Sequence, residues 1–344
     1  MSLRVAGGLA ALLLAMVSAC SPPSPPPLPT PEPRVGPSID WVVFGDYPYS
    51  RRQLRQLPDV VAQINQEPGV QVAFHLGDIK EAGPCTTSYY REVKEKFDGF
   101  TVPLVYTFGD NEWTDCIKPE NGGFDPQDRL AALRKVFIPE PGYTLGRRLP
   151  VDSQADQGFP ENVIFVGAPV TFAVFHAVGS ENGLAPQPGR LAPTPAQKAE
   201  ERDRSAAASR LIQQAFRAAT SMQSAAVVLM TQADFFPPGT EEPKLASGYR
   251  SIVKTIAQEA NLFEGEVYLF NGDSHSYATG RPLQAGSVWT SRYDVKPVEN
   301  LTRITIDGDE NVDSYLKVTA RRYSTPVVTW TKVPLRTKSP SGDR

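Results

Sequence analysis

The sequence has few of the features that would tie it to a nucleic acid or to a membrane-spanning helix. Its 35 lysines and arginines are outnumbered by 38 aspartates and glutamates, so the formal net charge is −3. A chain with that balance carries no broad basic surface, and no nucleic-acid partner is expected. The N-terminal apolar stretch, Val5 to Ala19, is too short for a permanent transmembrane helix. The hydrophobic fraction of 40% is nevertheless enough for a sizeable core.

The N-terminus has the pattern of a bacterial export signal. Arg4 supplies the positive start, and the apolar stretch after it ends in Val17-Ser18-Ala19-Cys20, which resembles a lipobox. We therefore expect residues 1–19 to be a signal peptide and Cys20 to be lipidated, which would anchor the protein to a membrane of the cell envelope. Ordinary secretion is the alternative. Residues 20–38 are proline-rich and predict a semi-rigid tether.

Only three cysteines are present. If Cys20 carries lipid, Cys85 and Cys116 remain as an even pair in an oxidising compartment. Each follows a strand that ends in an aspartate, Asp78 and Asp110 respectively. Adjacent parallel strands would bring the two thiols within reach, so we predict a disulfide between them.

Four apolar segments end in the same way, and they define the fold class. Each is a β-branched or aromatic run followed by Gly-Asp, which is typical of a buried strand with polar residues at its carboxyl end. When such strands are parallel, their carboxyl ends share one edge, where ligand sites of α/β proteins form. The aspartates would meet there, and closely spaced carboxylates need cations or protons. The four aspartates are Asp46, Asp78, Asp110 and Asp273.

The remaining pattern suggests a single domain over residues 39–333, with a tail at 334–344. Ser50-Arg51-Arg52-Gln53 fits a capping box, but Pro58 falls inside the helical pattern that follows, so the helix is expected either to be kinked or to begin at Pro58. Residues 162–166 and 170–178 predict an antiparallel hairpin, and Thr194 predicts the start of a long helix. Residues 301–306 and 315–320 are expected to be antiparallel edge strands, joined by a solvated hairpin turn at Gly308-Asp309.

Taken in order, the polar residues resemble a known family pattern. Asp46, Asp78, Gly109-Asp110-Asn111-Glu112, Gln232 and Gly272-Asp273-Ser274-His275 are similar to the motifs of the calcineurin-like metallophosphoesterase superfamily. The stretches GDNEWTDC and GDSH look like a divergent bacterial branch of it. The resemblance implies a four-layer α/β/β/α sandwich with two mixed sheets. It also implies two divalent metal ions.

The resemblance assigns a metal-binding role to six residues. Asp46 and His275 would bind the first ion and Asp78 would bridge the two ions. The second ion would be bound by Asp110, Gln232 and Asp273, unless a shift of one residue makes Asn111 the ligand. Four family histidines are missing, and the oxygen-rich set that replaces them favours Mg²⁺, Mn²⁺ or Ca²⁺ over Zn²⁺.

Residues around this ligand set have open roles. Asn111 stands where the family has the histidine that protonates the leaving group, so that help would come from His275, His176 or water. Glu112 is expected to contact the ligands from behind, and His176 either does the same or belongs to the core. His75 lies within an apolar strand, so a core position is expected for it.

Two functions follow from the resemblance. The first is a divalent-metal-dependent phosphoesterase of the cell envelope, which would hydrolyse a phosphate monoester or diester with metal-activated water. The second is a catalytically silent relative with a binding or interaction role. The carboxylates favour the enzyme, and the missing catalytic histidine favours the silent relative.

Overall fold

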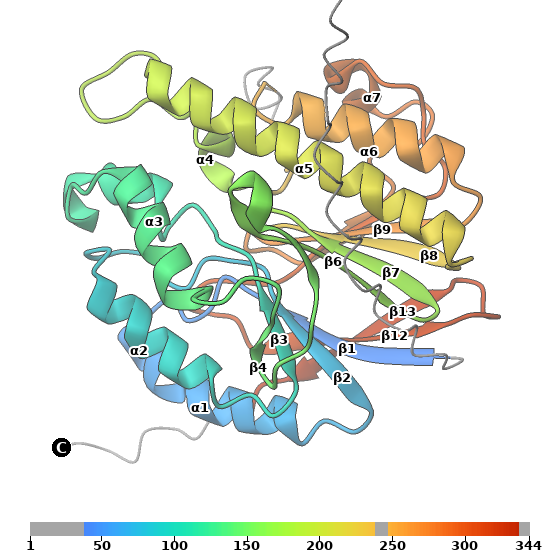
Figure 1. The fold of residues 1–344 in the computed structure, drawn as a ribbon, viewed down its shortest axis with the longest axis horizontal. Coiled ribbons are helices and arrows are strands. Elements are labelled where there is room, and N and C mark those ends of the chain that lie inside the picture. The colour runs from blue at the N-terminus through green and yellow to red at the C-terminus, as the bar shows by residue number, and fades with distance from the viewer. Residues whose placement is uncertain (1–37, 238–246, 337–344) are drawn as a thin grey trace, which may run out of the picture. The chain divides into compact units, whose positions relative to one another are not determined.

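Two mixed β-sheets form the centre of the computed structural model, which describes residues 38–237 and 247–336 (Figure 1). The first sheet has six strands in the order β13-β12-β1-β2-β3-β4. Its strands are β1 (Ser38–Phe44), β2 (Val70–His75), β3 (Pro103–Tyr106), β4 (Leu145–Gly146), β12 (Ser314–Arg321) and β13 (Val328–Pro334). Strands β1, β2 and β3 are parallel, as the sequence predicts.

The second sheet has seven strands in the order β10-β11-β9-β8-β7-β6-β5. Its strands are β5 (Asp152–Gln154), β6 (Phe159–Gly167), β7 (Val170–Val174), β8 (Ala226–Met230), β9 (Glu266–Asn271), β10 (Ala278–Gly280) and β11 (Leu301–Thr305). Strands β7, β8, β9 and β11 are parallel neighbours. The predicted hairpin is confirmed, because β6 and β7 pair antiparallel.

Helices α1 (Arg51–Asn65), α2 (Thr87–Phe97) and α3 (Pro126–Phe137) cover the outer face of the first sheet, and α5 (Pro195–Ser221) and α6 (Arg250–Leu262) cover that of the second. The short α4 (Gly179–Asn182) follows β7, and α7 (Val288–Tyr293) contacts α6. Three 3₁₀ turns complete the set, η1 (Thr114–Ile117), η2 (Pro119–Asn121) and η3 (Ala155–Gln157). No helix in the part of the chain that the structure describes is long and apolar enough to cross a membrane.

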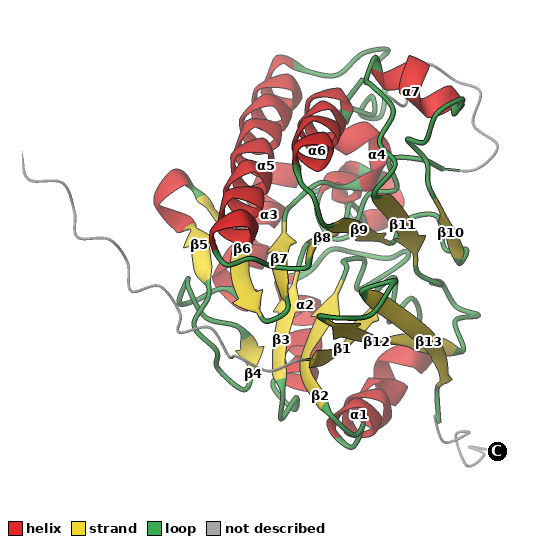
Figure 2. Cartoon of the chain, turned by 90° about the vertical axis from the view of Figure 1, so that its right-hand side faces the viewer, coloured by secondary structure: helices red, strands yellow, loops and turns green. Residues whose placement is uncertain are grey.

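The four layers follow from strands that are apolar on both faces. In β1, Trp41 and Val43 pack between the sheets, whereas Val42 and Phe44 pack under α1 and α2. In β8, Val228 faces the inter-sheet core and Leu229 faces α5 and α6. Figure 2 shows the order helices, sheet, sheet, helices. The predicted α/β/β/α sandwich is therefore confirmed.

Local signals set the starts of two helices. Ser50 caps α1, and this helix runs through Pro58, so the alternative start at Pro58 is wrong. The Gln53 side chain accepts a hydrogen bond from the Tyr49 amide at 2.6 Å, so it does not complete the expected capping box at Ser50. Thr194 caps α5 with a complete capping box, as the sequence predicts.

The predictions for the last strands are partly wrong. β11 is antiparallel to β10 but parallel to β9, and it lies between them, so the predicted edge position is wrong. β12 is antiparallel, but it lies between β1 and β13. Because β11 and β12 belong to different sheets, Gly308-Asp309 is no solvated hairpin turn. Gly308 is buried, and the Asp309 amide donates to the Asp46 carbonyl oxygen at 3.1 Å.

Several predictions fall on residues outside the described part. These are the signal peptide at 1–19, the lipidated Cys20, nearly all of the tether and most of the tail. The described residues lie within one compact unit.

Candidate metal centre

Five strands bring the predicted site residues to one place between the sheets. Asp46, Asp78 and Asp110 follow β1, β2 and β3, while Gln232 and Asp273 follow β8 and β9. Both sheets therefore contribute side chains, which local sequence patterns alone do not reveal.

Strained backbone marks the same residues. Asp46, Asp78, Asp273 and His275 have φ values of 45°, 57°, 70° and 56°. A left-handed conformation is uncommon for residues other than glycine and persists where the surrounding structure enforces it. Four such residues within one cluster favour a functional role for it.

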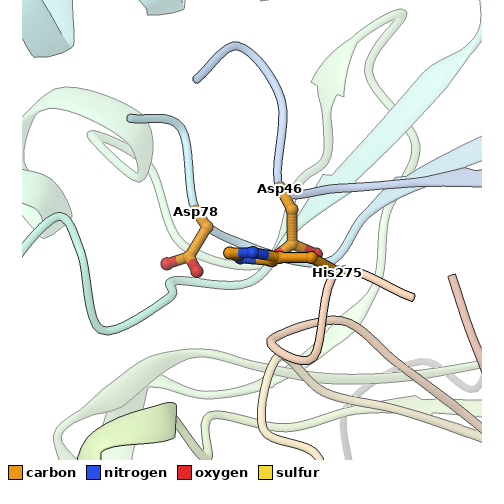
Figure 3. Close-up of side chains that lie close together, drawn as sticks. All are labelled: Asp46, Asp78 and His275. Carbon is orange, nitrogen blue, oxygen red and sulfur yellow. The ribbon is translucent and has the colours of Figure 1, made fainter. Parts of the chain in front are cut away.

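The first ligand group consists of Asp46, Asp78 and His275. Figure 3 shows these three side chains side by side, each carried by a separate segment of the chain. One ligand atom from each lies within 4.8 Å of the other two. His275 Nε2 is 3.5 Å from Asp46 Oδ1. Asp46 and Asp78 are buried, whereas the His275 side chain is 36% exposed.

The second ligand group consists of Asp78, Asp110 and Asp273, which also offer ligand atoms within 4.8 Å of one another. Asp78 belongs to both groups, the place that the sequence assigned to a bridging residue. The metal-binding roles themselves remain predictions.

Tyr49 is the site residue that the sequence analysis missed. Its hydroxyl lies 2.9 Å from Asp78 Oδ2, 2.8 Å from His275 Nε2 and 3.4 Å from Asp46 Oδ1, at the centre of the first ligand group. The only signal was a tyrosine one residue beyond Pro48, the position where the family has a histidine. The Asn111 side-chain amide donates to the same hydroxyl at 2.9 Å.

Gln232 lies at the centre of the second ligand group. Its Nε2 is 3.0 Å from Asp78 Oδ2, 3.2 Å from Asp110 Oδ1 and 3.1 Å from Asp273 Oδ1. Its Oε1 accepts a hydrogen bond from the Gly179 amide at 2.6 Å. The side chain thus presents its nitrogen, not its oxygen, to the carboxylates.

Glu112 lies behind the ligands, as expected. Its fully buried carboxylate accepts hydrogen bonds from the amides of Asp78, Gly109 and Ile79 and from the Tyr106 hydroxyl, over 2.6 to 3.3 Å. One side chain therefore fixes the two loops that carry Asp78 and Asp110.

Burial makes these carboxylates hard to ionise. Desolvation raises the pKa of Asp46 to about 8 and, with the charge of Asp115, that of Asp110 to about 6. Burial and the charge of Asp110 raise the pKa of Asp78 well above its usual value. Burial also lowers the pKa of His275. The cluster is short of positive charge.

The other two histidines lie away from the ligands. His75 is buried among Phe44, Phe97 and Tyr106, with Nε2 2.6 Å from the Tyr47 carbonyl oxygen, as a core residue should be. His176 is also buried. Its Nδ1 lies 2.9 Å from Glu161 Oε1, and its ring packs on Phe108 and Trp113. Its contacts are those of a core residue.

The segment at α4 closes the second ligand group from one side. Ser180, Glu181 and Asn182 have φ values of 51°, 57° and 59°, so α4 is a left-handed turn. The Ser180 hydroxyl is 2.7 Å from Asp110 Oδ2 and 2.9 Å from Asp115 Oδ1. Ser180 also lines a cavity of about 410 Å³, together with Trp113 and Lys118. The cavity is therefore separated from the Asp110 carboxylate only by the Ser180 side chain.

Two glycines are required where backbone meets carboxylate. A Cβ on Gly109 would approach Asp78, and one on Gly179 would approach Asp110 and Asp273, at less than 3.0 Å. Real Cβ atoms essentially never show such contacts. The loops therefore wrap the carboxylates more closely than other residues would allow.

The predicted disulfide is confirmed. Cys85 and Cys116 are bonded, with Cα atoms 5.8 Å apart. Both sulfur atoms lie near the carbonyl oxygen of Asn111, at 3.6 and 3.8 Å. The bridge ties the segment after Asp78 to the segment after Asp110.

Comparisons with known proteins give a fold-level likeness only. No protein-family model and no curated protein matches the chain. One similar solved structure is GAP50, the anchor in the inner membrane complex of Plasmodium, with 9% identity, coverage of 88% of this chain and 90% of that chain, and a TM-score of 0.40. Another is TT1561 of Thermus thermophilus, with 10% identity, coverage of 87% and 99%, and a TM-score of 0.41.

Proposed function

We propose that the protein is a divalent-metal-dependent phosphoesterase of the calcineurin-like type, tethered to the cell envelope through lipid on Cys20. The observation that carries the proposal is that the two ligand groups share Asp78. Buried like charges at this spacing are costly unless cations neutralise them.

The donor atoms fit a hard cation. The groups offer carboxylate oxygens and a single imidazole, which suits Mg²⁺, Mn²⁺ or Ca²⁺ better than Zn²⁺. Asp46 Oδ2 is buried and has no hydrogen-bond partner among the described residues. Bound among these ligands, a divalent ion would stabilise negative charge on a phosphoryl group and activate water.

The chain's own residues position the carboxylates. The backbone amide of Asn111 donates to Asp78 Oδ1 at 3.1 Å, and its side-chain amide donates to the Tyr49 hydroxyl at 2.9 Å. His275 belongs to the first ligand group, so its Nε2 would hold the ion rather than carry a proton. Because Asn111 cannot protonate a leaving group either, water would do so, and poor leaving groups should react slowly, by a factor on the order of 10²–10⁴.

The cavity beside Ser180 gives room for the organic part of an ester. Its volume of about 410 Å³ lies in the range of small-molecule sites. Trp113 offers an apolar wall and Lys118 a positive charge, although Lys118 also pairs with Asp115 at 2.6 Å.

A catalytically silent binding protein is the second candidate. It is favoured by the Tyr49 hydroxyl and the Gln232 amide, which already contact the carboxylates from within the chain. In that case a cation would bind, but no ester would be hydrolysed.

The test is hydrolysis of p-nitrophenyl phosphate and bis-p-nitrophenyl phosphate by the purified chain with Mn²⁺, Mg²⁺ or Ca²⁺. We expect metal-dependent turnover that falls by at least about 100-fold in Asp78→Asn, because that residue serves both groups. Asp98→Asn, at an exposed position paired with Lys94, is the matched control and should keep full activity. Equal rates for wild type and Asp78→Asn would reject the enzyme.

A further inference from the structure

The two ligand groups have centres of different chemistry. The centre of the first group is an oxygen, the Tyr49 hydroxyl. The centre of the second group is a nitrogen, Gln232 Nε2. This difference decides how many ions the site can hold.

The orientation of the Gln232 carboxamide is fixed by its neighbours. If the amide were turned over, its NH₂ would face the Gly179 N–H, and two donors would meet at 2.6 Å. Gln232 is fully buried, and its Cβ and Cγ lie within 3.0 Å of where a Cβ on Gly77 would be. The side chain is therefore wedged with its nitrogen toward the carboxylates.

A carboxamide nitrogen donates hydrogen bonds and does not act as a metal ligand. The outer oxygens of the second group also receive donors from the chain. Asp110 Oδ2 accepts from the Ser180 hydroxyl at 2.7 Å, and Asp273 Oδ2 accepts from the Asp234 amide at 3.5 Å. Hydrogen-bond donors thus take the role that a second cation would have.

The first group is left with capacity to bind. Asp46 Oδ2 has no partner among the described residues, and the Tyr49 oxygen lies 2.8 to 3.4 Å from one donor atom of each of the three side chains. Tyr49 also makes up for the histidine that is absent at Pro48. The first group then has two carboxylates, one imidazole and one phenol oxygen.

We propose that the centre holds one divalent cation, bound by Asp46, Tyr49, Asp78 and His275, while the Gln232 carboxamide replaces a second cation. The proposal deepens the phosphoesterase assignment because it names the form of its metal centre. It is tested without substrate, so a failure of hydrolysis leaves it standing.

The experiment counts Mn²⁺ ions in the metal-free, purified chain by isothermal titration, by elemental analysis after desalting and by electron paramagnetic resonance. Wild type should bind one ion per chain and give the spectrum of an isolated ion. Gln232→Glu keeps the shape of the side chain and offers an oxygen, so it should bind two ions with a coupled spectrum. Gln232→His, which offers an imidazole nitrogen, should do the same if it folds.

Two further variants complete the test. Tyr49→Phe keeps the ring and should lower the affinity for the single ion by about 10-fold or more, as loss of a ligand or of a residue that orients a ligand does. Gln214→His, at an exposed position of α5, controls for a new histidine and should leave one ion bound. Near-ultraviolet circular dichroism confirms that each variant is folded.

Three results would overturn the proposal. Two ions in the wild-type chain would show that Gln232 does not exclude the second one. No bound ion in a folded wild-type chain would remove the centre altogether. Unchanged affinity in Tyr49→Phe would show that the tyrosine is not a ligand.

Discussion

Glu112 offers the strongest single test of how the two site loops are held. Its carboxylate accepts four hydrogen bonds, three of them at Oε1 and one, from the Ile79 amide, at Oε2. In Glu112→Gln the amide oxygen can keep the three bonds at Oε1, but the amide NH₂ then faces the Ile79 N–H. That donor loses its acceptor inside the protein.

The expected loss follows from these bonds. Each bond that changes from a charged to a neutral acceptor weakens by roughly 1 kcal/mol, and an unsatisfied buried N–H costs about 1–3 kcal/mol. The substitution also removes a negative charge beside Asp78 and Asp110. The loss of its repulsion with these carboxylates offsets part of the destabilisation. We expect the free energy of unfolding to fall by about 2–4 kcal/mol.

Urea unfolding followed by circular dichroism measures this change. Glu95→Gln, at an exposed position of α2, should lie within about 0.5 kcal/mol of wild type. Tyr106→Phe removes only one donor to Glu112 and should cost about 1 kcal/mol. A Glu112→Gln variant as stable as Glu95→Gln, with an unchanged denaturant slope, would refute the role of Glu112 as the tie between the loops.

Three further predictions concern buried ion pairs and the disulfide. Burial tends to raise the pKa of Glu161, but hydrogen bonding and the charges of its partners, Arg134 among them, lower it to about 2. The folded pKa is thus below the usual 4.5, and about 3 kcal/mol of stability that is present above pH 4.5 should be lost as the pH falls to 2. Acid unfolding of Glu161→Gln should show a shallower loss over that range, and an identical pH profile would count against this. Replacing Cys85 and Cys116 by serine opens a loop with a sequence separation of 31 and should lower the free energy of unfolding by about 3–4 kcal/mol in urea, whereas no change would mean that the bridge is dispensable. Arg204→Met removes a fully buried guanidinium that bonds to the turn at α4 and should lower stability by about 3–5 kcal/mol in thermal unfolding, where an unchanged midpoint would contradict it.

Sequence reasoning succeeds where a local pattern and a general rule suffice. The Gly-Asp ends of β1, β2, β3 and β9 are local, and parallel pairing brings such ends to one edge. The disulfide follows from the same geometry. The four-layer sandwich was predicted from the resemblance to a known family. The apolar pattern of the strands alone would not predict it.

It fails where distant parts of the chain decide. Alternation of apolar residues in β11 and β12 is the same whether a strand is parallel or antiparallel, inside a sheet or at its edge. The segment at Gly308-Asp309 has the composition of a solvated turn, yet the crossing from one sheet to the other buries it beside Asp46. β13 begins with the alternating run Val328-Thr329-Trp330-Thr331 and was within reach of the same pattern rules.

The centre of the site lies further beyond sequence patterns. Tyr49 contacts the ligands because the loop after β1 turns it toward Asp78 and His275. These two residues follow other strands, β2 and β9. The direction of the Gln232 carboxamide is set by Gly179, which is 53 positions away in sequence. A pattern of residue types cannot specify either orientation.

The charge balance of the centre connects its strain with its function. Lys80 is a buried cation close to the centre, and its Nζ donates to the backbone oxygens of Asn111 and Glu81, at 3.3 and 3.5 Å. Its charge also acts on nearby carboxylates, among them Glu112, Asp78 and Asp110, but a single ammonium cannot balance all of them. Of these, Asp78 also lies on left-handed backbone, so repulsion and strain fall at one place. Charge repulsion and backbone strain persist together in a protein where a bound ligand offsets them. A cation is the ligand that fits here, because it attracts every member of the first ligand group.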